Sequence, residues 1–112
     1  MVNINGHHVE VHESRYQADN TPALVFIEPG DGQPFGSKPF GIATVCVAPV
    51  KVKEDEIVIK NWSENAGYLN ALLAADILQQ PHRTIPCGYT EAHVCRRGKN
   101  YDTEVFIHDD IE

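Results

Sequence analysis

The hydrophobic pattern of the chain changes period from that of strands to that of a helix and back again. Residues 8–16 alternate valine with polar side chains, which is typical of a strand with one wetter face. A turn then precedes the β-rich apolar run 23–28, ALVFIE, which predicts a second strand. Residues 40–47, FGIATVCV, are apolar or small on both alternating faces, so this run predicts a central strand covered on both sides.

The clearest predicted element is a helix of about four turns over residues 64–78. Apolar residues recur there at helical spacing and form one stripe: Ala66, Leu69, Leu72, Leu73 and Ile77. Ser63 is the expected N-cap, Glu64 complements the helix dipole, and Trp62 is expected to pack beneath the first turn. Capping therefore explains the motif Trp62, Ser63, Glu64 and Asn65 without a ligand.

The other segments complete an α+β pattern. Residues 57–62 predict a strand before the helix, and residues 89–96 and 101–108 predict a C-terminal hairpin after it. Proline and glycine make residues 29–39 the longest flexible loop, prolines bound an irregular connection over 81–86, and residues 109–112 form a short acidic tail.

Successive strands around one long helix do not form repeated βαβ units. They favour a mostly antiparallel sheet of about five or six strands, with the main helix on one face. At 112 residues, the chain has the size of a single α+β domain spanning residues 1–112.

Composition narrows the expected surroundings of the protein. Hydrophobic residues make up 42% of the chain and charged residues 22%, values typical of a chain that folds. No apolar run is long enough to span a membrane, and the first residues lack the basic and apolar regions of a secretory signal. The sparse, odd set of 3 cysteines favours a reducing cytoplasm.

Net charge argues against one class of partner. The chain has 9 Lys and Arg residues against 16 Asp and Glu residues, a formal net charge of −7. Such a chain repels phosphate backbones, so we expect no direct binding of nucleic acid.

Metal or thiol chemistry is the sharpest alternative that the residues offer. His82, Cys87, His93 and Cys95 all have side chains that bind zinc, and they lie close together in the sequence. They form no Cys-x-x-Cys knuckle, and buried cysteines with surface histidines in an ordinary hairpin give the same pattern. We therefore predict no catalytic residue, metal or cofactor, and keep a metal-binding or thiol-dependent protein as the alternative.

A second histidine group, His7, His8 and His12, lies on the first predicted strand. His8 and His12 are about 13 Å apart at the rise of a strand, too far for one ion to bridge directly. A polar strand face explains them. Weak pH sensitivity near pH 6 to 7, or adventitious metal binding, is the alternative.

Acidic residues gather in the last quarter of the chain: Glu91, Asp102, Glu104, Asp109, Asp110 and Glu112. A solvated face is the simpler interpretation, and basic residues at 96, 97 and 99 interrupt the cluster. The functional alternative is an acidic surface that competes with nucleic acid for a basic groove on a partner protein. The residues that would bind this partner are Asp102, Glu104, Asp109 and Asp110.

Three stretches of the chain together resemble a family of short proteins of phages and bacterial mobile elements, classed as a domain of unknown function. They are FGIATVCV at 40–47, EIVIKNWSENAGYLNALLAADIL at 56–78 and RTIPCGYTEAHVCR at 83–96. The matching residues are Ile57, Ile59, Lys60, Trp62, Ser63, Glu64, Asn65, Leu69, Leu72, Arg83, Thr84, Pro86, Gly88, Val94, Cys95 and Arg96. The chain departs from the family pattern at His82, where glycine is expected, and at Tyr89, where phenylalanine is usual.

The resemblance implies a bacterial cytoplasm and an accessory genetic element. With small size, acidity and no recognisable catalytic constellation, it predicts a non-enzymatic accessory protein that binds a host protein. Inhibition of a bacterial defence system, of the anti-CRISPR or anti-restriction type, is the expected role. The alternatives are the metal-binding or thiol-dependent protein above and a structural subunit of a homo-oligomer built through an exposed strand edge.

Overall fold

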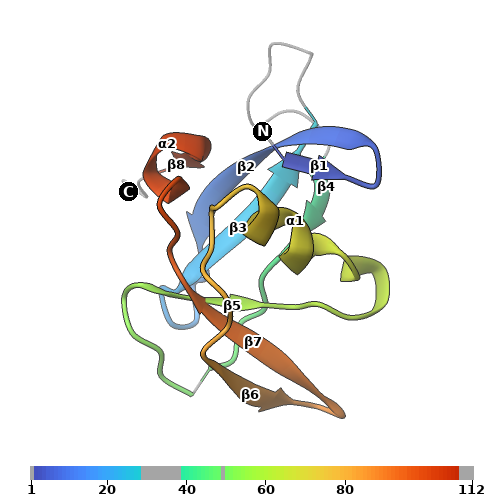
Figure 1. Cartoon of the computed structure of the whole chain (residues 1–112). Helices are drawn as coiled ribbons and strands as arrows, with labels where there is room; N and C mark the ends of the chain where they lie inside the picture. Colours follow the sequence, from blue (N-terminus) through green and yellow to red (C-terminus); the bar gives the residue numbers. More distant parts are fainter. Residues whose placement is uncertain (1, 29–38, 49, 109–112) are drawn as a thin grey trace.

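The computed structural model describes residues 2–28, 39–48 and 50–108, which form two β-sheets and short helices (Figure 1). The first sheet contains β1 (Val2–Ile4), β2 (His7–Arg15), β3 (Pro22–Ile27) and β4 (Pro39–Ile42) in that order, with β8 (Val105–Ile107) also paired to β2. The second sheet has the order β5 (Glu56–Ile59), β7 (Thr90–Arg96), β6 (Arg83–Cys87). The helical segments are η1 (Ser63–Asn65), α1 (Tyr68–Ala74) and α2 (Tyr101–Glu104).

β2 is the organising strand of the first sheet. Antiparallel β3 pairs with one edge of β2, and the other edge is shared by β1 over residues 7–9 and by β8 over residues 11–13. The β2–β8 pairing is parallel, so the last described strand lies beside a strand from the start of the chain. This placement brings β8 next to the site considered below.

One hydrophobic core joins both sheets and α1. Its members include Phe26 from β3, Ile57 and Ile59 from β5, Leu72 from α1 and Cys95 from β7. A smaller cluster on the other side of the second sheet contains Val47, Val58, Ile85, Ala92 and Val94. Because β5 is covered on both faces, all its residues are buried and its pattern is continuously apolar after the first position.

The run 40–47 does not form the central strand that its pattern predicts. Residues 39–42 form β4 at an edge of the first sheet, where Ile42 is 49% exposed. The chain then crosses to the second sheet through a bridge between Thr44 and Ile59, and the Lys60 amide donates a hydrogen bond of 2.9 Å to the Ala43 carbonyl oxygen. The apolar character of this run thus reflects a crossover between two sheets.

The helix α1, Tyr68–Ala74, is shorter than the helix that the apolar stripe predicts over residues 64–78. Gly67, at φ +95°, lies before the first residue of α1, and Ser63 has a φ of +56° in the separate turn η1. No side-chain hydrogen bond caps either helical segment, so the prediction that Ser63 is the N-cap is wrong. A helix cannot continue through left-handed residues, yet Ile77 remains in the core because the chain folds back beyond α1.

The predicted C-terminal hairpin is also wrong. Residues 101–104 form α2, and residues 105–107 pair with β2 rather than with β7. The antiparallel partner of β7 is β6, in the segment predicted to be irregular, and the turn between them contains Gly88 at φ +65°. Pro86 is compatible with this strand because β6 pairs with β7 on one side and is the last strand in its sheet within the described chain.

The coarser prediction of α+β structure with a mostly antiparallel sheet is confirmed. Strands predicted over 8–16, 23–28, 57–62 and 89–96 correspond to β2, β3, β5 and β7, whereas β1 was not predicted. The loop predicted over 29–39, apart from residue 39, and the tail 109–112 lie outside the described residues. Within the described segments, none of the helices has both the length and the apolar character needed to cross a membrane.

Candidate functional site

A cleft of about 780 Å³ opens where the end of β2 meets the segments before β5 and after β7. We call it the charged cleft. It is lined by Glu13, Arg15, Asp19, Asn20, Thr21, Pro22, Val52, Lys53, Glu54, Asp55, Arg97, Ile107 and His108. These residues are brought together from distant parts of the chain by the pairing of β2 with β8 and by the packing of the two sheets.

Glu13 lies against the interior of the charged cleft, with only 2% of its surface exposed. Its carboxylate accepts hydrogen bonds from the Tyr101 hydroxyl and from Arg15 Nη2, the latter at 3.1 Å. Arg97 Nη2 lies 3.7 Å from the same carboxylate. A buried carboxylate is costly unless it is paired and hydrogen-bonded, so these partners explain why β2 can bury Glu13.

Tyr101 and Arg97 form the support of this arrangement. The Arg97 guanidinium lies over the Tyr101 ring, 4.7 Å from its centroid. Burial, followed by the hydrogen bond to Glu13, raises the pKa of Tyr101, so its hydroxyl keeps its proton and acts as a donor. Glu13 therefore fixes the position of two arginines at the cleft without leaving its own charge uncompensated.

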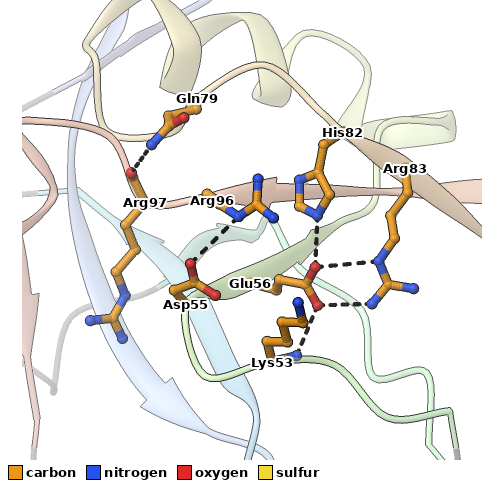
Figure 2. A network of polar contacts seen from close by, with 8 residues as sticks. All are labelled: Lys53, Asp55, Glu56, Gln79, His82, Arg83, Arg96 and Arg97. Carbon is orange, nitrogen blue, oxygen red and sulfur yellow. Dashed lines mark hydrogen bonds and ion pairs between the residues drawn. The ribbon is translucent and has the colours of Figure 1, made fainter.

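Glu56 is the second buried glutamate in the described chain, also 2% exposed. Figure 2 shows its carboxylate in contact with Lys53, His82 and Arg83. Oε1 accepts hydrogen bonds of 2.8 Å from Arg83 Nη2 and from the Lys53 amide, and Oε2 is 3.3 Å from Arg83 Nε. His82 Nε2 lies 2.7 Å from Oε2. The hydrogen bonds from Arg83 are the main reason that the pKa of Glu56 falls to about 2.

This network fixes one wall of the charged cleft. The bond from the Lys53 amide ties the segment that contains Lys53, Glu54 and Asp55 to the first residue of β5. Asp55 forms an ion pair with Arg96, drawn in Figure 2, in which Oδ2 lies 3.6 Å from Nε. The side chains of Lys53 and Glu54 are left exposed to solvent at the cleft, with no ion-pair partner in the described part of the chain.

His108 lines the charged cleft and pairs with His12, which is not among the lining residues. His12 Nδ1 lies 2.8 Å from His108 Nε2, and His12 Nε2 lies 3.0 Å from Glu10 Oε1. Phe106 stacks on His12 at 4.8 Å between ring centroids. His12 is only 3% exposed, because β8 covers this part of β2. The sequence-based expectation that His12 lies on a solvent-exposed strand face is therefore wrong.

The acidic residues predicted to bind a partner are only partly placed by the structure. Asp102 is exposed and Glu104 is half-buried on α2. Asp109 and Asp110 lie outside the described residues. Neither Asp102 nor Glu104 lines the charged cleft.

The alternative zinc ligands do not converge. His82 binds Glu56, and His93 lies opposite Thr84 and Ile59 in the sheet. Cys95 is fully buried, and burial raises the pKa of its thiol to about 11, which disfavours a thiolate at neutral pH. Among the residues that the structure describes, no three His, Cys, Asp or Glu side chains gather closely enough to hold a metal ion.

The motif at 62–65 connects two elements instead of capping α1. Asn65 is 3% exposed and donates a hydrogen bond of 2.7 Å from Nδ2 to the Ile42 carbonyl oxygen of β4. Trp62 packs against the smaller hydrophobic cluster, with Lys60 Nζ 5.8 Å from its ring centroid. The motif thus positions the crossover between the two sheets.

Sequence reasoning missed the residues that organise the charged cleft: Glu13, Arg15, Glu56, Arg83, Arg97 and Tyr101. By the alternation of β2, Glu13 falls on the same face as Val9 and Val11, so its position was a local signal of burial, although nothing local identifies its partners. Glu56 offered a weak signal, since it directly precedes a fully apolar run.

Comparison of the chain with protein-family models, with curated proteins and with solved structures found no match, so no relative's activity bears on the cleft.

Proposed function

We propose that this protein is a non-enzymatic binding protein that holds a charged segment of a partner protein in the charged cleft. The observation that carries this proposal is a concavity of about 780 Å³ whose lining is positioned by two buried glutamates. Pockets that take small molecules and cofactors have volumes of about 300 to 1,000 Å³, so a concavity of this size has room for a few side chains of a partner.

The buried glutamates support binding because they order the cleft in advance. Glu13 holds Arg15 and Arg97, and Glu56 holds the segment that carries Lys53. Ordering side chains and loops on association costs free energy. A site whose charged groups are already held by internal bonds avoids part of that cost.

The lining indicates the chemistry of the bound segment. Lys53 and Glu54 present opposite charges side by side, and Asp19 and Asp55 lie among the lining residues with the two arginines. Such a surface suits a polar segment that carries charges of both signs, and disfavours a long apolar one. A lining of this kind favours specificity over bulk hydrophobic affinity.

The resemblance to proteins of phages and mobile elements supports a biological setting for this activity. In that setting the protein acts in the bacterial cytoplasm, and the partner is a host protein, such as a component of a restriction or CRISPR nuclease complex. The acidic residues Asp102, Glu104, Asp109 and Asp110 then attract a basic partner at longer range, with the charged cleft providing the specific contact.

The test is capture of a partner by a charge-swapped variant. The double variant Lys53→Glu, Glu54→Lys reverses the local charges and leaves the net charge at −7. The Glu56 bond to residue 53 uses the main-chain amide, so the wall is expected to persist. A matched control, Lys51→Glu with Glu91→Lys, makes the same exchange at exposed residues outside the cleft.

We expect the amount of a host protein that co-purifies with the natural chain to fall at least about tenfold with the cleft variant. A loss of about 1.4 kcal/mol in binding free energy gives that factor. The control variant should retain the host protein. Thermal melts establish that both variants are folded. Equal retention by the two variants would contradict the proposal, as would equal loss from both.

A further inference from the structure

We infer that His12 and His108 form a pH-sensitive latch that holds β8 against β2 at neutral pH and releases it in mild acid. The latch forms a wall of the charged cleft, since Ile107 and His108 both line it. The opening of the latch involves only β8 and β2, so it does not depend on a partner. The effect of this opening on a partner rests on the function proposed above.

The geometry of the pair requires a shared proton. The two ring nitrogens lie 2.8 Å apart, and the rings stack with centroids 5.0 Å apart at an interplanar angle of 12°. One nitrogen must donate and the other accept, because two N–H groups cannot be hydrogen-bonded to each other. The contact therefore exists only while at least one of the two histidines is neutral.

Glu10 fixes the roles of the ring nitrogens of His12. Its carboxylate accepts from His12 Nε2, which leaves His12 Nδ1 as acceptor for the His108 Nε2–H when both rings are neutral. One added proton still leaves the pair with a donor and an acceptor, so the hydrogen bond survives it.

The second proton breaks the latch. When both rings are protonated, His108 Nε2–H faces His12 Nδ1–H at hydrogen-bond distance and neither nitrogen can accept. Burial, and after it the charge of His12, lower the pKa of His108. A base with a lowered folded-state pKa gives stability that is complete above the free imidazole value of about 6.5 and is lost as the pH falls through the lower folded value.

Charged groups surround the pair. Glu10 Oε1 lies 3.0 Å from His12 Nε2, and the residue opposite His12 on β3 is the uncharged Val25. Charged residues on α2 and around the cleft that His108 lines are Asp102, Glu104, Glu13, Arg15, Arg97, Asp19, Lys53, Glu54 and Asp55.

β8 is suited to release because it is short and two of its three side chains are about half exposed. It spans only residues 105–107, and Phe106 and Ile107 are 51% and 46% exposed. The His108 amide donates a hydrogen bond of 3.1 Å to the Glu13 carbonyl oxygen at the end of the strand. Loss of the latch is therefore expected to free residues 106–108 while Tyr101 keeps α2 attached to Glu13.

Hydrogen exchange of the purified chain tests the latch without a partner. The amides of residues 106–108 are followed from pH 7.5 to 5.0 and corrected for intrinsic exchange. Uptake of one proton on opening raises the opening constant by up to about tenfold per pH unit. We expect a rise of at least about tenfold in the natural chain and little change in His108→Gln, which does not titrate.

The matched control is His8→Gln, an exposed histidine on the same strand that lies outside the pair. It should keep the full pH response. A natural chain without the rise, or a His108→Gln variant that retains it, would overturn the inference. An equal rise in β3 amides would overturn it too, since that would show unfolding of the whole sheet.

A second measurement separates the latch from the proposed function. If exchange shows that β8 opens but the captured partner binds equally at pH 7.5 and 5.0, the charged cleft is not the binding site and the latch stands. If the partner is lost on acidification in both the natural chain and His108→Gln, binding depends on other titrating groups, and the latch does not regulate it.

Discussion

The hydroxyl of Tyr101 donates a hydrogen bond to the buried carboxylate of Glu13, although the two residues are 88 positions apart in the sequence. This bond joins α2 to β2, and α2 leads directly into β8. Since Glu13 also binds Arg15 and lies near Arg97, one carboxylate connects the start of the chain, the segment after β7 and the C-terminal elements.

Replacement of Tyr101 with phenylalanine removes this donor and leaves the ring in place. Hydrogen bonds to buried charged groups contribute about 1.5 to 3 kcal/mol, so we expect a loss of that size in the free energy of unfolding measured with urea. Tyr89→Phe is the control, because Tyr89 is fully exposed. Equal stability of the two variants would show that Glu13 is satisfied without the hydroxyl.

Glu56 is expected to make the free energy of unfolding depend on pH. Its pKa is lowered from 4.5 to about 2, so the stabilisation is present above pH 4.5 and is lost as the pH falls towards 2. We expect Glu56→Gln to cost about 2 to 3 kcal/mol at pH 7 and to flatten the decline in stability between pH 4.5 and 2. Urea titrations at several pH values measure this. The exposed Glu91→Gln should leave the decline unchanged; an unchanged decline in Glu56→Gln would refute the assignment.

Leu72 tests the packing of α1. It is fully buried in the core shared by both sheets, so Leu72→Ala is expected to lower the free energy of unfolding by about 2 to 5 kcal/mol. Asn70→Ala, at an exposed position of the same helix, should change it by less than about 0.5 kcal/mol. Similar melting temperatures for the two variants would show that Leu72 does not lie on the face of α1 that packs against the core.

Two residues of the motif at 62–65 are expected to contribute different amounts to the free energy of unfolding. Asn65→Ala removes the buried bond to the Ile42 carbonyl oxygen and should cost about 1 to 3 kcal/mol. Ser63→Ala should cost less than about 0.5 kcal/mol, because Ser63 makes no capping bond. Chemical denaturation compares them directly, and a larger loss at Ser63 would restore its role as a cap.

The acidic residues of the C-terminal segment are tested by association kinetics with a captured partner. If they attract a basic surface, Asp102→Lys with Asp109→Lys should slow association and change dissociation little. Raising salt from about 50 to 300 mM should have the same effect, since the Debye length falls below about 10 Å. An association rate that responds to neither would leave these residues as a solvated face, with the charged cleft as the remaining contact.

Local pattern in the sequence was enough to predict the strands β2, β3, β5 and β7 and the existence of a helix around Leu69 and Leu72. Alternation, apolar runs and helical spacing depend on residues close together in the chain, and each can be recognised without a neighbour. The overall α+β class followed from the order of these elements.

Only the tertiary structure decided which polar residues are buried. The alternation in β2 marks His12 and Glu13 by face, but it does not show that β8 will cover one of them or that Tyr101 will satisfy the other. The length of α1 was likewise limited by left-handed backbone at Gly67 and Ser63. The charged cleft exists because segments far apart in the sequence meet at two buried carboxylates, and the free energy of burying such a charge depends on partners that local sequence does not identify.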